Sequence, residues 1–390
     1  MASDEFIKIP KIFLILGGFW PFSVTKDPLK GKLYKVYSKF QTYSYVTLIA
    51  SLVLKLVILI VRKEDETLIF RDLNVLVLVF ETCVKILIFQ RMKIPHMFEH
   101  AMKHERNIFK SRDLELIICY QEQVKYGRRV NLSQFLVTTL STSTFAVTAL
   151  LDVYWAADMS KYEKEPFMHD LWFPFRRETH MNWVIFFNLF MIVQGTCFNT
   201  ATQATLINLM IYSSSRLKLL GLKLRKFDAI ASQNGREILE TVHDLIFEHQ
   251  DLLSFVESLN VRIKYVLLME FILNELGLAS GIIQLIVIDT TSYMVSVVTI
   301  IILQLFQIFV IAWTANEITI QGAKIADSVM ASNWVEQPTN IKKLFLIMVM
   351  RAQRPLGLTA GPFFNMNANT AVSTVKAAYT YLTFMMNNYN

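Results

Sequence analysis

The sequence has few of the residues and motifs on which soluble enzymes and disulfide-rich secreted domains depend. Only three cysteines occur among the 390 residues, and each lies in or beside an apolar segment, so we expect no disulfide bond. A Gly-rich phosphate-binding loop, a nucleophile elbow and a catalytic His/Asp/Ser series are all absent from the sequence. We therefore predict that the chain is not an enzyme and carries no cofactor.

Apolar residues, in contrast, are abundant. The chain is 53% hydrophobic, it contains 29 phenylalanines, and its mean hydropathy is +0.38. Soluble domains average about 45–50% apolar residues, and here the excess falls in blocks long enough to cross about 30 Å of hydrocarbon as helices. The sequence predicts an all-α, polytopic membrane protein. We relate its formal charge of +7 to lipid contact and membrane orientation, not to nucleic acid.

Seven apolar segments predict seven transmembrane helices. They cover residues 42–61, 68–90, 132–155, 183–212, 263–288, 294–313 and 371–386. The fourth, fifth and sixth helices continue beyond the bilayer, so we expect them to project into the cytoplasm and pack there. Ahead of the first span, residues 12–22 predict an amphipathic arm at the cytoplasmic lipid surface. A signal peptide is disfavoured because no small-residue cleavage site follows.

The chain divides into two functional parts on this interpretation. Residues 1–337 contain the first six spans, and residues 338–390 contain a short cytoplasmic anchor helix at 341–351, a Gly/Pro turn at 358–364 and the terminal helix.

The distribution of lysine and arginine predicts the orientation in the membrane. Both residue types are concentrated at positions 1–40, 91–129 and 213–264, and the loops between these segments are poorer in them. Because basic loops stay in the cytoplasm, the N-terminus is predicted to be cytoplasmic and the C-terminus extracellular. A G-protein-coupled receptor has the opposite orientation. This sequence also lacks the Asp-Arg-Tyr, Asn-Pro-x-x-Tyr and paired loop cysteines of those receptors.

The terminal helix carries more polar groups than a lipid-facing span tolerates. Thr380, Phe384 and Asn388 recur every four residues and share one helix face, and Lys376 lies one step earlier in the same series. We interpret this stripe as the lining of an ion pore, with Phe384 as a hydrophobic gate and Asn388 at the mouth. The alternative is a set of helix–helix contacts, since hydroxyl and amide groups often hydrogen-bond between membrane helices.

Small hydroxyl residues also cluster in the third span, at 138–144, beside Phe145. Such a cluster indicates either a bent helix whose hydroxyls bond the preceding turn, or the wall of a small-molecule pocket. On the pocket interpretation the ligand-contacting candidates come from several spans. They are Asn74, Thr148, Trp155, Phe187, Met191, Tyr293 and Val297. A tryptophan at the end of a span, such as Trp155, can instead be an interfacial anchor.

Some charged and histidine residues have no obvious place in a membrane span. Glu81 and Lys85 are spaced for a helix ion pair. Glu270, in the fifth span, either faces water or pairs with a basic residue. A histidine series at positions 96, 100 and 104 has a metal-ligand spacing, but no cysteine or carboxylate shares its face, so no metal site is predicted.

Four stretches resemble insect odorant receptors, specifically their variable odour-tuning subunits. The first is LWFPF at 171–175, with Gln194 in the helix behind it, and the second is HQDLLSFVE at 249–257. The third is the pair Ser328 and Trp334 after span six. The fourth is MRAQRP at 350–355, followed by Ala360-Gly361, Phe364 and KAAYTY at 376–381. The short segment between spans four and five resembles a tuning subunit more than the shared coreceptor. The tail lacks the Gln-Phe ending of the related gustatory receptors.

The resemblance implies an odorant-gated, non-selective cation channel in the plasma membrane of sensory neuron dendrites. Its expected partners are a small volatile organic ligand, a coreceptor subunit within a tetramer, membrane lipid and the permeating cations. The family also implies a pocket in the outer half of the membrane and a pore lined by the last helix. A gustatory-type channel is the nearest alternative. A G-protein-coupled receptor or a transporter fits less well, and internal repeats of the transporter kind are absent from the sequence.

Overall fold

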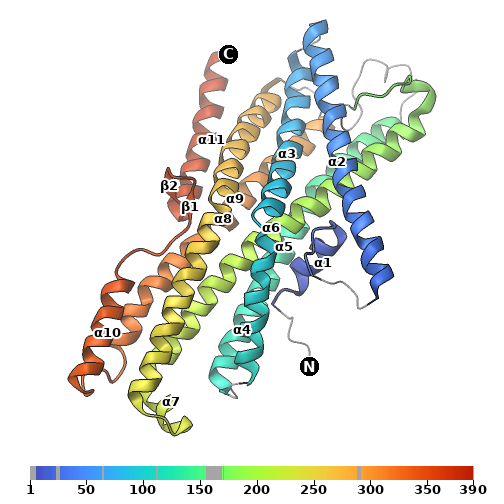
Figure 1. Ribbon diagram of the computed structural model, residues 1–390. Coiled ribbons are helices and arrows are strands. Elements are labelled where there is room, and N and C mark those ends of the chain that lie inside the picture. Colours follow the sequence, from blue (N-terminus) through green and yellow to red (C-terminus); the bar gives the residue numbers. More distant parts are fainter. Residues whose placement is uncertain are drawn as a thin grey trace.

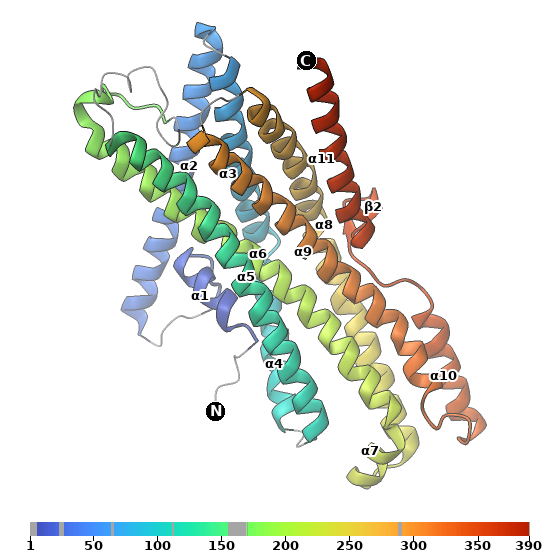
Figure 2. The same cartoon turned by 180° about the vertical axis from the view of Figure 1, so that it is seen from behind.

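The computed structural model describes residues 6–22, 27–63, 66–110, 113–154, 169, 171–287 and 291–389, and most of these residues are helical. Figures 1 and 2 show long helices running side by side, with α11 at one edge and α7 and α10 at the opposite end. The elements are α1 (Lys8–Leu16), α2 (Pro28–Arg62), α3 (Glu66–Arg91), η1 (Ile94–Met97), α4 (Phe98–Lys110), α5 (Leu114–Tyr154), η3 (Glu178–His180), α6 (Met181–Arg225), α7 (Phe227–Asn234), α8 (Ile238–Val287), α9 (Thr291–Met330), α10 (Thr339–Ala352), β1 (Thr359–Ala360), β2 (Phe364–Asn365) and α11 (Ala368–Tyr389).

Each predicted span corresponds to one helix, in the order α2, α3, α5, α6, α8, α9 and α11. Within the described residues, five helices are long and apolar enough to cross a membrane by length and composition alone: α2, α5, α6, α8 and α9. The other two carry polar groups along their length, because α3 holds buried charges and α11 holds hydroxyl groups. Their place in the membrane therefore depends on their neighbours.

Three helices extend well beyond a bilayer, as predicted: α6 has 45 residues, α8 has 50 and α9 has 40. The same is true of α5, which begins at Leu114, well before the predicted third span at 132–155. Leu116, Tyr120 and Val124 recur every four residues and are buried in the core formed by these helix extensions, the extension core. This apolar stripe extends the helix although charged residues lie between its members.

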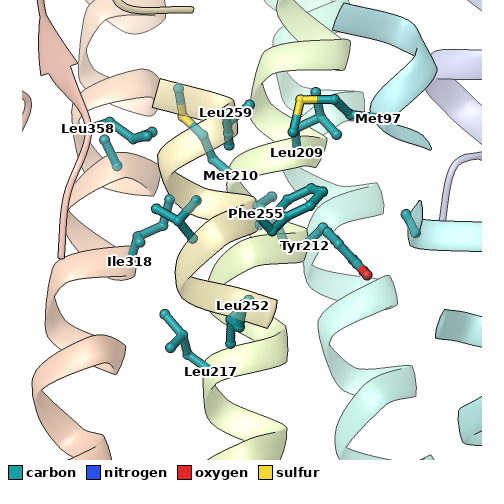
Figure 3. Packing of buried hydrophobic residues seen from close by; sticks show 14 of the residues in the cluster. Met97, Leu209, Met210, Tyr212, Leu217, Leu252, Phe255, Leu259, Ile318 and Leu358 are labelled. Carbon is teal, nitrogen blue, oxygen red and sulfur yellow. The ribbon is translucent and has the colours of Figure 1, made fainter. Parts of the chain in front are cut away.

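The centre of this extension core lies where the extensions of α6, α8 and α9 meet (Figure 3). Leu209 and Leu217 from α6, Leu252 and Leu259 from α8 and Ile318 from α9 are all at most 1% exposed. Burial of each such side chain stabilises the fold by about 1.5–3 kcal/mol. The extensions thus form a closely packed core of their own, continuous with the predicted spans.

The N-terminal arm forms the predicted helix and packs one face on the protein, and its place at the lipid surface stays a prediction. Leu14 on α1 is completely buried, and the Phe13 ring lies 5.2 Å from that of Phe135 on α5. The backbone N–H of Trp20 donates to the hydroxyl of Tyr34 on α2 at 3.0 Å. One face of the short helix is apolar, and it is the helix extensions that cover this face.

A two-stranded hairpin, β1 and β2, joins the anchor helix α10 to α11 and confirms the predicted Gly/Pro turn. Gly361 in this turn has a φ of 57°, in the left-handed region that glycine adopts readily. Its N–H donates to the carbonyl of Lys264 at 2.8 Å, and the Thr359 N–H donates to Asn260 Oδ1 at 2.9 Å. These bonds fix the start of α11 to α8.

Candidate functional site

An internal cavity of about 120 Å³ lies among the membrane spans. Helices α2, α3, α5, α6 and α9 and the His169 side chain surround it. The lining residues are Tyr45, Val75, Leu78, Val79, Glu81, Thr82, Thr138, Ser141, Thr142, Phe145, His169, Met191, Ile192, Gly195, Thr196, Asn199, Ile300, Leu303 and Gln307. The surface of the cavity is mostly apolar, as is usual for a small-molecule site, although about half of the lining residues carry a polar group.

The hydroxyl cluster of the third span belongs to this cavity and also bonds to its own helix. Thr138 Oγ1 donates to the Gln134 carbonyl and Thr142 Oγ1 to the Thr138 carbonyl, each at 2.9 Å. On α6, Thr196 Oγ1 donates in the same way to the Ile192 carbonyl at 2.7 Å. Thr138 Oγ1 also accepts from Gln134 Nε2 at 3.3 Å. Because Thr142 and Thr196 donate their protons to the backbone, their oxygens remain available to accept a hydrogen bond from a molecule in the cavity.

The sequence-predicted contact residues are distributed over several environments. Met191 lines the cavity and is 1% exposed. Thr148 Oγ1 lies 3.0 Å from Ser296 Oγ, and this contact joins α5 to α9 one turn beyond the cavity. Val297, the residue after Ser296, is also buried. Phe187 is 37% exposed, and its ring centroid lies 6.2 Å from that of Phe173.

The remaining predicted contacts lie outside what the structure describes. Trp155 falls outside the described residues, and the side chains of Asn74 and Tyr293 are likewise outside them. Contact of all these residues with a ligand stays a prediction.

Sequence reasoning missed several lining residues, of which Gln307 on α9 is the most informative. It is a long amide within an apolar span, 4% exposed, and its Nε2 atom has no hydrogen-bond partner in the described part of the chain. A buried amide nitrogen that donates to no protein group is a candidate for donating to a ligand. The polarity of Gln307 within its span was the available signal, but only the fold shows that it faces the cavity.

A buried charge cluster adjoins the cavity through Glu81. Lys85 Nζ lies 2.5 Å from Glu81 Oε1 and 3.2 Å from Glu270 Oε1 on α8. Gln203 Nε2 on α6 donates to the same Glu270 oxygen at 2.5 Å. The predicted Glu81–Lys85 pair is confirmed, and the open question about Glu270 is resolved in favour of pairing with a lysine. The cluster links three helices behind the cavity wall.

The exposed side of α11 is divided into a polar and an apolar flank. Ala371 and Thr374 are buried on the side that packs against α8 and α9. Lys376 and Thr380 are exposed on the polar flank, whereas Val375 and Tyr379, at 54% and 68% exposure, lie on the other. The side chains of Phe384 and Asn388 lie outside the described residues. In the single chain, Lys376 and Thr380 of the predicted stripe therefore face away from α8 and α9.

Two of the three spaced histidines belong to a network of charged groups in the extension core. His100 Nε2 lies 3.4 Å from Asp251 Oδ2, and His104 Nε2 lies 3.8 Å from Glu248 Oε1. Burial lowers the pKa of His104 to about 4, against the effect of Glu248. Burial opposes ionisation of Glu248, but His104, Lys223 and Arg216 together lower its pKa to about 2. The network joins α4 to α6 and α8, which is a structural role.

A sequence profile described as 7tm odorant receptor matches residues 66–379 of the chain. The chain belongs to this odorant receptor family. Its similar relatives are receptors and not enzymes, and with its spanning helices this receptor is a membrane protein.

Curated relatives of the receptor include odorant receptor 10 of Aedes albopictus, 29% identical over 50% of this chain and 52% of its own length. Odorant receptor 30a of Drosophila melanogaster is 24% identical over 52% of this chain and 55% of its own length. The receptor thus matches about half the length of these relatives.

Solved structures match the receptor over almost its whole length. Olfactory receptor OR5 of Machilis hrabei superposes with a TM-score of 0.80 at 16% identity, covering 98% of this chain and 97% of that one. The same receptor solved in complex with eugenol gives a TM-score of 0.82 at 17% identity over 99% and 98% of the chains. The likeness confirms the all-α fold with seven transmembrane helices.

Proposed function

We propose that this odorant receptor binds a small volatile organic molecule in the cavity among α2, α3, α5, α6 and α9, and that binding opens a non-selective cation path. The observation that carries the proposal is the cavity itself, about 120 Å³ in volume, mostly apolar and lined by buried polar groups such as Gln307. The eugenol complex of the Machilis hrabei receptor supports a ligand of this class.

The chemistry of the lining residues defines which groups a ligand of this cavity carries. Apolar contacts with residues such as Met191 and Phe145 favour ligands that fit the cavity, and each buried CH₂ group contributes about 0.8 kcal/mol to the free energy of binding. The hydroxyl oxygens of Thr142 and Thr196 can accept a hydrogen bond, and the Gln307 amide can donate one. One or two such bonds are enough to select among molecules of similar size.

Helix α9 connects the cavity to the proposed pore helix. Ile300, Leu303 and Gln307 line the cavity, and α9 also packs against α11. A ligand shifts gating only through different affinities for the closed and open arrangements. We propose that the contacts between the ligand and α9 differ between the closed and open arrangements. Residues 1–337 then hold the ligand, and residues 338–390 provide the anchor and the pore.

The pore is proposed to form where several copies of α11 meet, with Lys376, Thr380, Phe384 and Asn388 facing the ion path. The polar flank of α11, exposed in the single chain at Lys376 and Thr380, supports this arrangement. We propose a tetramer that includes the coreceptor, in the plasma membrane of sensory dendrites. The N-terminus is cytoplasmic and the C-terminus extracellular in this arrangement.

Whole-cell currents from cells expressing the receptor with and without coreceptor, exposed to an odorant panel, test the proposal. Met191→Trp fills much of the cavity and should raise the half-maximal odorant concentration at least tenfold without changing ion selectivity. The matched control is Val193→Trp, the same replacement on the same helix at a position that is 62% exposed. Equal effects of the two replacements would overturn the cavity as the binding site.

Two further variants separate ligand binding from permeation. Thr148→Leu removes the hydroxyl contact with Ser296 and should shift odorant potency while leaving ion selectivity unchanged. Phe384→Ala should change basal current or permeation and leave potency unchanged. The reverse pattern would overturn the assignment of cavity and pore.

A further inference from the structure

We propose that a second cleft, between the N-terminal arm, α2 and the turn from α3 to η1, binds the headgroup of an anionic phospholipid of the cytoplasmic leaflet. The cleft has a volume of about 740 Å³. It is lined by Gly18, Phe19, Trp20, Pro21, Phe22, Pro28, Gly31, Lys32, Tyr34, Lys35, Ser38, Lys39, Phe89, Gln90, Lys93, Pro95 and His96.

The charged lining residues are all basic. Lys32, Lys35 and Lys39 are spaced three and four residues apart, so they project from one face of α2, and Lys93 lies on the wall formed by α3 and η1. No carboxylate is among the described lining residues. The nearest acidic residue in the sequence, Asp27, caps α2 by accepting a hydrogen bond from the Leu29 N–H at 3.0 Å. The cleft therefore favours an anion.

Lys93 adopts a backbone conformation that suits glycine better than lysine. Its φ is 51°, in the left-handed region, and it lies just beyond the end of α3, where glycine is the common residue. The turn is held in place by the Arg262 side chain, which donates to the Met92 carbonyl. A lysine at this strained position places a fourth cation at the cleft, which glycine would not.

Most of the other lining residues are aromatic or apolar, and several are buried. Trp20 is 5% exposed and Phe89 is 2% exposed. The arm lies directly on α2, because a Cβ atom on Gly18 would come within 2.8 Å of Ser38 Cα. Fixed apolar walls beside lysines match a molecule with both a phosphate and an acyl region. Free phosphate would use only the lysines.

The position of the cleft relative to the predicted hydrocarbon spans also fits a lipid headgroup. The predicted hydrocarbon spans begin at residue 42 on α2 and end at residue 90 on α3, so the lysines lie just outside the hydrocarbon. Anionic lipids concentrate in the cytoplasmic leaflet and attract basic residues at this level. This step rests on the proposed cytoplasmic location of the N-terminus.

Binding of fluorescent short-chain phosphatidylinositol bisphosphate to the purified full-length receptor in detergent tests the proposal. The comparison ligands are short-chain phosphatidylcholine, the soluble inositol phosphate headgroup and inorganic phosphate. Saturable binding of the anionic lipid is expected, with no binding of phosphatidylcholine and at least tenfold weaker binding of the two soluble anions. Equal binding of phosphatidylcholine, or of either soluble anion, would overturn the lipid assignment.

Two variants test the site. Lys35→Gln/Lys39→Gln should weaken lipid binding at least tenfold. Lys93→Gly should weaken it about fivefold while relieving the backbone, so thermal stability should not fall. The control is Lys63→Gly, because Lys63 has a φ of 53° at the other end of α2. Unchanged affinity in both cleft variants would overturn the proposal.

A separate measurement distinguishes this proposal from the proposed orientation. An N-terminal epitope accessible in unpermeabilised cells would overturn both the orientation and the cytoplasmic-leaflet assignment. If the epitope is hidden and neither variant loses lipid binding, the lipid site alone is overturned.

Discussion

The Nζ atom of Lys85 on α3 lies 3.2 Å from the Oε1 atom of Glu270 on α8, and both side chains are at most 4% exposed. Glu81, which lines the ligand cavity, contacts the same lysine at 2.5 Å. A charge in an apolar interior is tolerated only when it is paired and hydrogen-bonded. The cluster therefore ties the cavity wall to the helix on which α11 packs.

Replacing Lys85 by methionine should destabilise the receptor strongly, because two carboxylates then face each other without a cation. Breaking a buried pair costs about 3–5 kcal/mol. The measurement is the apparent melting temperature of the detergent-solubilised receptor. The control is the neutral triple variant Glu81→Gln/Lys85→Met/Glu270→Gln, which should recover most of the loss. A melting temperature unchanged by Lys85→Met would contradict this account of the cluster.

Reversing the charge of Lys376 should increase cation conductance if α11 lines the pore. An exposed lysine repels cations within about 10 Å at moderate ionic strength, and a glutamate attracts them. Lys376→Glu should therefore raise single-channel conductance, most at low salt. Val375→Glu, on the apolar flank of the same helix turn, is the control for introducing a carboxylate. Conductance that responds equally to both variants, or to neither, would argue against this flank as the pore wall.

Gly361→Ala should displace the start of α11. The new Cβ atom would lie 2.8 Å from Leu268 Cδ2, and the left-handed conformation itself costs a non-glycine residue about 1–2 kcal/mol. Gly235 provides a matched control, because its φ of 61° is similar and a Cβ atom added there would meet nothing within 4 Å. Surface expression and peak current should fall more for Gly361→Ala than for Gly235→Ala. Equal losses would show that the contact with Leu268 is unimportant.

The extension core should lose stability as pH falls from 6.5 to 4. Folding lowers the pKa of His104 from 6.5 to about 4, so the unfolded chain binds more protons in this window and stability rises with pH. At pH 5 this group lowers the free energy of unfolding by about 2 kcal/mol relative to its value at neutral pH. His249, whose pKa burial and Arg351 lower to about 4, contributes in the same direction.

The variant His104→Gln should therefore reduce, but not abolish, the dependence of melting temperature on pH between 6.5 and 4. Loss of Glu248 ionisation, whose pKa is about 2, begins only below this window. His243→Gln, at an exposed position on α8, is the control. A pH dependence identical in the His104 variant and the unmodified receptor would contradict the assignment.

The number and order of the membrane helices could be predicted because hydrocarbon imposes a length and a polarity on each segment independently of the others. Local chemistry also predicted the Glu81–Lys85 pair, since both residues lie one turn apart on a single helix. The Gly361 turn was predictable for a similar reason, because glycine and proline restrict the backbone locally.

The composition of the cavity was decided only by the tertiary structure. Met191 was predicted and lines it, but Thr148 contacts Ser296 instead, and Gln307 was not predicted at all. A difference of one residue turns a side chain by about 100° around its helix, and in a span that is apolar on all sides the sequence does not define which side faces inward. The partner of Glu270 was likewise determined by packing between α3 and α8, which are distant in sequence. The sequence by itself determined which segments enter the membrane, and packing between helices decided which side chains meet there.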